Sequence, residues 1–133
     1  MLKSFCLWLR LCSSITGVPY VIDGDTIAVK SYHIRLEGVD AEELNEPYGP
    51  QAKAMLKAII GRNRVTCKLT GERSYERYVG VCYIDVFGNP LYDIAIRMIQ
   101  SGYALDCAHY SHGRYRPYEP ADARNKLIQK PYC

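Results

Sequence analysis

Acidic and basic side chains occupy separate parts of the first half of the chain. Residues 23–46 carry seven acidic and two basic side chains, whereas residues 47–77 carry seven basic and two acidic ones. Two such neighbouring segments suit a site that holds a cation and attracts a polyanion. A solvated charged surface has the same composition and is the commoner origin of the pattern, so charge alone does not decide between them.

Three short motifs contain the side chains best suited to chemistry. They are D-G-D-T at 23–26, R-L-E-G-V-D-A-E-E at 35–43 and S-Y-E-R at 74–77. Taken singly, each has a structural explanation. D-G is a turn signal, the apolar residues on either side of Arg35 are typical of a half-exposed strand, and a Glu-rich loop is usually solvated. Only their combination indicates a site.

Length and composition narrow the class of protein. The 133 residues suit one domain, and 48% hydrophobic with 23% charged residues excludes disordered and fibrous proteins. The net charge of +3 is too small to identify a partner. No run approaches the roughly 18 apolar residues of a membrane-spanning helix. We therefore expect no transmembrane segment, and we expect a monomer.

Six cysteines are many for a chain of this length. They form no C-x-x-C pair or Cys/His cluster, which argues against structural zinc. Their even number favours an oxidising compartment. Lys3 precedes the apolar residues 5–9, but this stretch is short and Arg10 follows it. Residues 1–17 are therefore expected to be a leader, either a weak or truncated export signal or an unusual start to a first strand. A secreted or periplasmic location is favoured.

Local patterns predict five strands and three helices. Val, Ile, Thr and Tyr are frequent in the predicted strands, which span 18–23, 26–29, 32–36, 64–69 and 79–84. The first three strands form a meander, and the last two form a hairpin around a polar loop at 70–77. That hairpin places Cys67 opposite Cys82, where either a disulfide or two buried thiols would fit.

The helix signals are Pro and Asp at the starts and Gly or Pro at the ends. They predict helices from Pro50 to Gly61, from Asp93 to Gly102, and from Pro120 to before Pro131. These elements define an α+β protein in which a small barrel would close the sheet.

The motifs together resemble the staphylococcal nuclease (thermonuclease) family. D-G-D-T, R-L-x-G-V-D-A-x-E, Y-G-P-Q-A, Y-x-R and D-I-x-x-x-M-I-x-x-G-Y-A follow the family's order over residues 18–126. The resemblance implies a five-stranded OB-type β-barrel with three helices in residues 18–130, followed by a tail at 131–133. It also implies a calcium-dependent phosphodiesterase that cuts DNA and RNA.

The resemblance assigns four positions to a metal centre. Asp25 and Asp40 would be carboxylate ligands, Ala41 would offer its backbone carbonyl, and Asp23 would lie just behind them. Hard oxygen donors suit Ca²⁺, and residue types alone do not exclude Mg²⁺.

Four further positions would act on the substrate. The resemblance implies that Arg35 and Arg77 grip the scissile phosphate, that Glu43 is the general base and that Tyr75 contacts a nucleotide phosphate. Two guanidinium groups suit this role because their charge is permanent and their hydrogen bonds are paired.

The sequence departs from the family pattern at two places. Glu42 stands where the family usually has proline, which makes it a rival base or an additional metal neighbour. Near Arg77, Ser74 and Glu76 replace the usual basic residue and glycine, so Arg73 is the alternative phosphate-binding arginine.

These features predict a metal-dependent endonuclease with little sequence specificity, because contacts to the nucleic-acid backbone carry no sequence code. The leading alternative is a non-catalytic OB-fold module that binds single strands. A protein-interaction or cell-surface domain is a third possibility, and it would show no chelator-sensitive activity.

Overall fold

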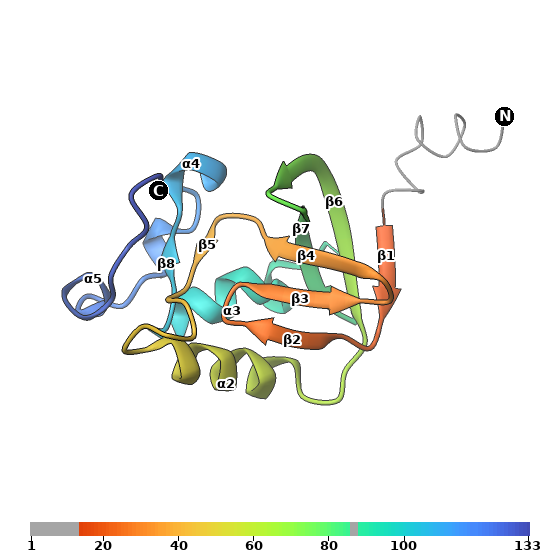
Figure 1. The fold of residues 1–133 in the computed structure, drawn as a ribbon, viewed down its shortest axis with the longest axis horizontal. Coiled ribbons are helices and arrows are strands. Elements are labelled where there is room, and N and C mark those ends of the chain that lie inside the picture. The colour runs from red at the N-terminus through yellow and green to blue at the C-terminus, as the bar shows by residue number, and fades with distance from the viewer. Residues whose placement is uncertain (1–13, 86–87) are drawn as a thin grey trace, which may run out of the picture.

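The computed structural model describes residues 14–85 and 88–133. Its larger sheet contains six strands in the order β1-β6-β7-β4-β3-β2 (Figure 1). The consecutive antiparallel strands of the meander are β2 (Tyr20–Asp23), β3 (Thr26–Val29) and β4 (Tyr32–Leu36). The predicted meander is therefore confirmed, and the turn between β2 and β3 contains the D-G-D-T motif.

The second half of the sheet is a long hairpin. It consists of β6 (Val65–Ser74) and β7 (Arg77–Ile84), and β7 pairs in parallel with β4. The polar loop predicted at 70–77 is wrong, because pairing resumes after an irregularity and continues to the pair Ser74 and Arg77. This outer part of the hairpin lies beyond the core. Its backbone amides and carbonyls form hydrogen bonds between the two strands, and this pairing does not require apolar side chains at alternate positions.

An edge strand adds to the predicted sheet. β1 (Ser14–Gly17) pairs with β6, although these residues were assigned to the leader. β1 also contacts β3, so the sheet curls back on itself as in OB-type barrels. The predicted export signal at residues 1–13 lies outside the described residues.

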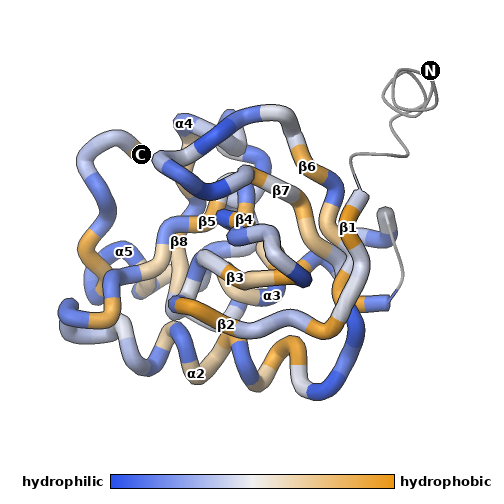
Figure 2. Tube along the Cα trace, turned by 45° about the vertical axis from the view of Figure 1, so that its right-hand side comes forward, coloured by the Kyte–Doolittle hydropathy of each residue, from blue (hydrophilic) through white to orange (hydrophobic). Residues whose placement is uncertain are grey.

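Two of the three predicted helices are confirmed. α2 (Gly49–Ile60) has Pro50 in its first turn and Gly61 at its C-cap, and it buries one face. That helix alternates hydrophobic and hydrophilic stretches along its length (Figure 2). α3 (Ile94–Gln100) begins at Asp93, whose side chain accepts a hydrogen bond from the backbone amide of Ala95.

The third predicted helix is wrong over most of its length. Only α5 (Ala123–Lys126) is helical there, and residues 127–133 beyond it form no regular secondary structure. The backbone amides of Ile128 and Lys130 are bonded to the buried carboxylates of Glu42 and Asp40. These distant acceptors replace the carbonyls that a continued helix would have used.

Short elements complete the described chain. They are α4 (Ala108–Ser111), η2 (Pro90–Tyr92) and η3 (Arg116–Tyr118). The molecule has the predicted α+β fold of OB type, with more short helical segments than expected. None of the described helices is long and apolar enough to cross a membrane.

A second, two-stranded sheet positions the candidate site. β5 (Val39–Asp40) pairs antiparallel with β8 (Leu105–Asp106), a pairing that local patterns did not predict. The segment that carries Asp40 therefore lies beside β8, in the C-terminal part of the chain (Figure 1). The β2–β3 turn lies next to the same segment, because Asp25 accepts a hydrogen bond from the Ala41 amide.

Candidate active site

Two buried aspartates form the centre of the site. Asp25 and Asp40 are each only 3% exposed. Asp25 accepts a hydrogen bond from the Thr26 hydroxyl at 3.0 Å through Oδ1, and one from the Ala41 amide at 3.3 Å through Oδ2. The second bond joins the β2–β3 turn to the segment after β5. The close packing depends on Gly24, because a Cβ there would lie 2.7 Å from the Cβ of Ala41.

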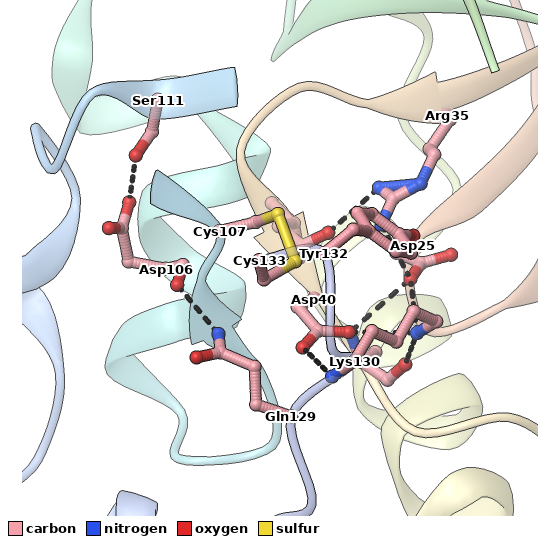
Figure 3. The surroundings of a disulfide bond; sticks show 12 residues. Asp25, Arg35, Asp40, Asp106, Cys107, Ser111, Gln129, Lys130, Tyr132 and Cys133 are labelled. Carbon is pink, nitrogen blue, oxygen red and sulfur yellow. Dashed lines mark hydrogen bonds and ion pairs between the residues drawn. A yellow bond between two sulfur atoms is a disulfide. The ribbon is translucent and has the colours of Figure 1, made fainter. Parts of the chain in front are cut away.

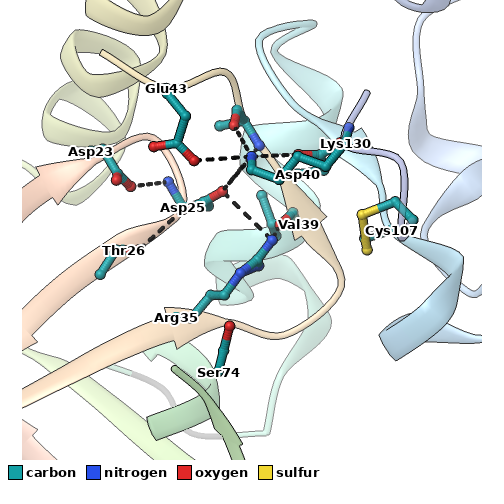
Figure 4. A network of polar contacts seen from close by, with 12 residues as sticks. Asp23, Asp25, Thr26, Arg35, Val39, Asp40, Glu43, Ser74, Cys107 and Lys130 are labelled. Atoms are coloured by element: carbon teal, nitrogen blue, oxygen red, sulfur yellow. Dashed lines mark hydrogen bonds and ion pairs between the residues drawn. A yellow bond between two sulfur atoms is a disulfide. The ribbon is translucent and has the colours of Figure 1, made fainter. Parts of the chain in front are cut away.

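Asp23 supports this turn from behind. Its Oδ1 accepts a hydrogen bond from the Asp25 backbone amide at 3.1 Å (Figure 4). Burial, together with the nearby Asp25 charge, raises the pKa of Asp23 to about 7. The Asp23 carboxylate is therefore bonded to the backbone of Asp25, and its role behind a metal ligand stays a prediction.

A lysine ammonium group lies at the point where the acidic groups converge. Four oxygens surround Lys130 Nζ: Ala41 O at 2.7 Å, Asp40 Oδ1 at 2.8 Å, Glu43 Oε1 at 3.5 Å and Asp25 Oδ2 at 3.6 Å (Figure 4). The backbone amide of Lys130 also donates to Asp40 Oδ2 at 3.0 Å. The molecule therefore has a cation position lined by the predicted ligand atoms.

The chemistry of these donors fits a hard divalent cation. Within the described chain, no three His, Cys, Asp or Glu side chains form a metal-binding group by themselves. Asp25 and Asp40 supply two carboxylates, and the Ala41 carbonyl supplies the third oxygen. Carboxylate and carbonyl oxygens are the ligands preferred by Ca²⁺ and Mg²⁺. The position already accommodates the positive charge of Lys130, so its residues fit the divalent metal ion that the family resemblance implies.

The charges at this point stabilise one another. Burial would raise the pKa of the Asp25 carboxyl, but the positive charges of Arg35 and Lys130 outweigh it and lower that pKa below 3.8. Burial favours the neutral amine of Lys130, yet the Asp25 and Asp40 carboxylates raise its pKa above the ordinary 10.5. The lowered pKa of Asp25 and the raised pKa of Lys130 keep both of these groups charged at neutral pH.

Arg35 lies directly beneath the cation position. Its side chain is 1% exposed, and its Nη2 is 3.8 Å from Asp25 Oδ2. Nη1 donates to the Val39 carbonyl at 3.0 Å and Nη2 donates to the Tyr132 hydroxyl at 3.1 Å. Among the described residues, Arg35 Nε is the buried side-chain nitrogen without a hydrogen-bond partner. An unpaired buried donor of a permanent cation is suited to an anionic ligand.

Arg77, rather than Arg73, reaches the acidic centre. Arg77 Nη1 donates to Thr26 Oγ1 at 3.0 Å, and that hydroxyl in turn donates to Asp25. The Arg73 guanidinium instead lies 4.1 Å from the Tyr78 ring and bonds to backbone carbonyls of the hairpin turn. The geometry favours Arg77 over its alternative as a partner of Arg35.

Glu42 and Glu43 have different surroundings. The Glu42 carboxylate is buried, and its two oxygens accept the backbone amides of Tyr48 and Ile128 at 3.0 and 2.9 Å. Both oxygens are thus committed to the backbone, which argues against a role as rival base or metal neighbour. The Glu43 side chain is 51% exposed and faces the cation position. Gly49 supports this segment, since a Cβ there would lie 1.8 Å from the Glu43 carbonyl oxygen.

An aromatic groove of about 370 Å³ lies beside Arg35. Its lining residues are Arg73, Ser74, Tyr75, His109, Tyr110 and Tyr132. Tyr75 is 88% exposed at the tip of the β6–β7 hairpin. Tyrosine rings beside a buried guanidinium provide surfaces for nucleotide bases and a donor for phosphate.

Most of the chain matches a known protein family. Residues 33–128 match the family model described as staphylococcal nuclease homologue. The chain belongs to the staphylococcal nuclease family. The resemblance identified from the sequence motifs is thereby confirmed.

Individual relatives show the extent of the similarity. A probable staphylococcal-like nuclease of Oryza sativa subsp. japonica, CAN2, is 33% identical over 97 residues, which is 71% of this chain and 25% of that protein. An uncharacterized endonuclease of Escherichia coli O157:H7 is 37% identical over 81 residues, 57% of this chain and 53% of its own. One from Haemophilus influenzae (strain ATCC 51907 / DSM 11121 / KW20 / Rd) is 28% identical over 100 residues, 71% of this chain and 53% of its own. The chain thus spans a quarter to about half of the length of these relatives.

The staphylococcal nuclease match does not include the whole site. Inside residues 33–128 lie Arg35, Asp40, Ala41, Glu43 and Arg77. Asp25 precedes the matched range, and Lys130 follows it. The lysine at the cation position is therefore outside the part of the chain that the family model recognises.

Sequence reasoning missed the C-terminal contributors to the site. Lys130 and Tyr132 reach it from a segment that was predicted to be the end of a helix and a short tail. Cys133 forms a disulfide with Cys107, which fixes this segment beside β8 (Figure 3). A lysine next to a proline near the end of a chain carries no local signal of such a contact, so only the fold could reveal it.

Proposed function

We propose that the protein is a metal-dependent nuclease that hydrolyses phosphodiester bonds of DNA or RNA with little sequence specificity. The observation that carries this proposal is the convergence of Asp25, Asp40 and the Ala41 carbonyl on one cation position, with Arg35 3.8 Å from Asp25. Membership of the staphylococcal nuclease family supports the reaction class.

Asp25, Asp40 and the Ala41 carbonyl would hold the ion, with Ca²⁺ expected and Mg²⁺ also compatible. When bound, a divalent ion supplies Lewis-acid polarisation of a phosphoryl oxygen. The protein's own contribution is to keep two carboxylates buried next to each other. The lowered pKa of Asp25 maintains its charge at any pH near neutrality.

The two arginines would bind the reacting phosphate. Arg35 offers an unpaired Nε from the protein interior, and Arg77 approaches from the start of β7 through Thr26. Negative charge increases on the phosphate oxygens as the bond breaks, and fixed guanidinium donors stabilise that charge without reorganising. Neither arginine can lose its proton, so this stabilisation persists over a wide pH range.

Glu43 is the proposed general base. Its carboxylate faces the cation position yet remains half-exposed, so it can accept a proton from an attacking water and return it to solvent. Tyr75 at the hairpin tip is placed to contact a neighbouring nucleotide phosphate. Contacts of this kind recognise the backbone rather than the base, which is the reason for the low specificity.

The compartment is part of the proposal. The four described cysteines form two disulfides, Cys67–Cys82 and Cys107–Cys133. The first confirms the register predicted for the hairpin and resolves the alternative of two buried thiols. Disulfides persist in oxidising environments, which supports a secreted or periplasmic location.

The decisive assay is digestion of plasmid DNA and of RNA by the purified protein with Ca²⁺, Mg²⁺ or EDTA. We expect Arg77→Ala to lose roughly a hundredfold or more in turnover, as for the removal of one donor to a transition-state oxyanion. Glu43→Gln should also lose activity while retaining its fold, because this side chain is half-exposed.

Arg97→Ala is the matched control for the arginine variant. Arg97 is exposed on α3, and its guanidinium bonds to the Leu91 carbonyl rather than to any residue of the site. Equal digestion by wild type, Arg77→Ala and Glu43→Gln would contradict the proposed site. Binding of single strands without any metal-dependent cleavage would instead support the non-catalytic alternative.

A further inference from the structure

The C-terminal segment Ile128–Cys133 lies across the candidate site and is fastened at several points. Its first amide, that of Ile128, donates to Glu42 Oε2 at 2.9 Å. Cys133 is bonded to Cys107 at the other end. Between these anchors, the Lys130 backbone amide donates to Asp40 Oδ2 at 3.0 Å. We call this segment the C-terminal strap.

Two side chains of the strap contact the proposed catalytic groups. Lys130 Nζ is within 2.8 Å of an Asp40 oxygen and within 2.7 Å of the Ala41 carbonyl oxygen. The Tyr132 hydroxyl accepts a hydrogen bond from Arg35 Nη2 at 3.1 Å (Figure 3). One short segment therefore fills the cation position and also accepts a hydrogen bond from one donor of the Arg35 guanidinium.

The Lys130 contacts have the character of a substitute cation. The ammonium neutralises two aspartates that are almost completely buried, and buried carboxylates without a counter-charge are strongly unfavourable. An ammonium hydrogen-bonded to Ala41 O and Asp40 Oδ1 leaves those oxygens unavailable to a second cation. The two positive charges would also repel each other at this distance. Binding of a divalent ion and insertion of Lys130 therefore exclude each other.

We propose that the C-terminal strap is an intramolecular competitor of the divalent cation, with Lys130 occupying the cation position and the Cys107–Cys133 disulfide holding it there. Only the identity of the competing ion depends on the function proposed above. Residues 129–133 of the strap, which include Lys130 and Tyr132, lie beyond the range 33–128 that the family model matches.

The role of the disulfide follows from effective concentration. A tether at Cys133, three residues from Lys130, confines the ammonium close to its acceptors, so little entropy is lost when it inserts. Without the tether, the backbone amides of Ile128 and Lys130 would still bond the strap to Glu42 and Asp40. Loss of the disulfide should therefore weaken the competition but not abolish it.

The test measures affinity for Ca²⁺ and Mg²⁺ by isothermal titration calorimetry on the full chain. Lys130→Met keeps the aliphatic side chain and removes the charge, and we expect the dissociation constant to fall roughly tenfold or more, equivalent to about 1.4 kcal/mol. Cys133→Ser should bind the ion more tightly than wild type, but less tightly than Lys130→Met. Lys57→Met removes one positive charge from an exposed position on α2 and should leave the affinity unchanged.

Thermal unfolding with and without Ca²⁺ provides an independent readout. A ligand that binds only the folded state raises the unfolding temperature, and at a fixed ligand concentration the rise is larger when the ligand binds more tightly. The rise should be larger for Lys130→Met than for wild type. If that variant fails to fold, Cys133→Ser, which retains every charge at the site, still tests the proposal. A folded Lys130→Met variant that binds Ca²⁺ with the affinity of wild type would overturn the proposal. If only Cys133→Ser folds, wild-type Ca²⁺ affinity in that variant would overturn it.

The digestion assay separates this inference from the proposed function. Tighter ion binding by Lys130→Met without any cleavage of nucleic acid would support competition by the strap and refute the proposed nuclease activity. Metal-dependent cleavage by wild type, with no change of ion affinity in Lys130→Met, would support the nuclease activity and refute competition by the strap.

Discussion

Replacement of Glu42 by glutamine should destabilise the protein strongly for a single-atom change. The buried carboxylate accepts two backbone amides, from Tyr48 and Ile128, one on each oxygen. Glutamine keeps one acceptor oxygen but places an NH₂ group against the other amide, so one bond is lost and two donors face each other. Hydrogen bonds to charged groups contribute about 1.5–3 kcal/mol, and a buried donor without a partner costs about 1–3 kcal/mol.

We therefore expect the free energy of unfolding to decrease by about 3 kcal/mol. For a chain of 133 residues this corresponds to a fall in Tm on the order of 10 °C. The decrease can be measured by urea unfolding at neutral pH. The shape of the side chain is retained, so cavity formation does not contribute to the result.

Hydrogen exchange locates the effect. The amides of Tyr48 and Ile128 should lose protection in Glu42→Gln, whereas amides in the β6–β7 hairpin should change only with global stability. Glu76→Gln is the matched control, because that side chain is exposed at the hairpin turn. A stability within about 0.5 kcal/mol of wild type, with unchanged exchange at Tyr48 and Ile128, would refute the bonding inferred for Glu42.

Two further predictions concern the scaffold. The paired variant Cys67→Ala with Cys82→Ala opens a cross-link of sequence separation 15, and should lose about 3 kcal/mol in urea unfolding; an unchanged midpoint and slope would contradict it. Burial raises the pKa of Asp93 above 3.8 despite its hydrogen bonds, so the folded state binds this proton more tightly than the unfolded state. The Asp93 contribution is therefore complete below pH 3.8 and lost as pH rises through the raised pKa. Relative to Asp93→Asn, wild type should become less stable over that interval, and a constant difference across pH would show that Asp93 does not titrate as expected.

The local elements of the fold were largely predictable because their signals act over a few residues. Asp93 caps α3 through a bond to an amide two positions away, and Pro50 and Gly61 delimit α2 by their own backbone preferences. The same short-range logic paired Cys67 with Cys82 across the hairpin.

The failures occurred where distant groups decided the backbone. The hairpin continues through the predicted loop at 70–77 because ladder pairing satisfies its amides without requiring apolar residues. The helix predicted after Pro120 stops early because the Ile128 and Lys130 amides bond to carboxylates about ninety residues earlier in the chain. Periodicity within a window contains no information about such partners.

The sequence by itself determined the family and the types of side chain at the site, since the D-G-D-T and R-L-x-G-V-D-A-x-E motifs specify both chemistry and order. Only the tertiary structure decided that Arg77 rather than Arg73 bonds to Thr26, whose hydroxyl donates to Asp25, and that Glu42 binds backbone amides. It alone placed Lys130 among the carboxylates. The physical reason is that electrostatic and hydrogen-bond partners are selected by distance in space, and the pairing of β5 with β8 and the Cys107–Cys133 link bring together residues that are far apart along the chain.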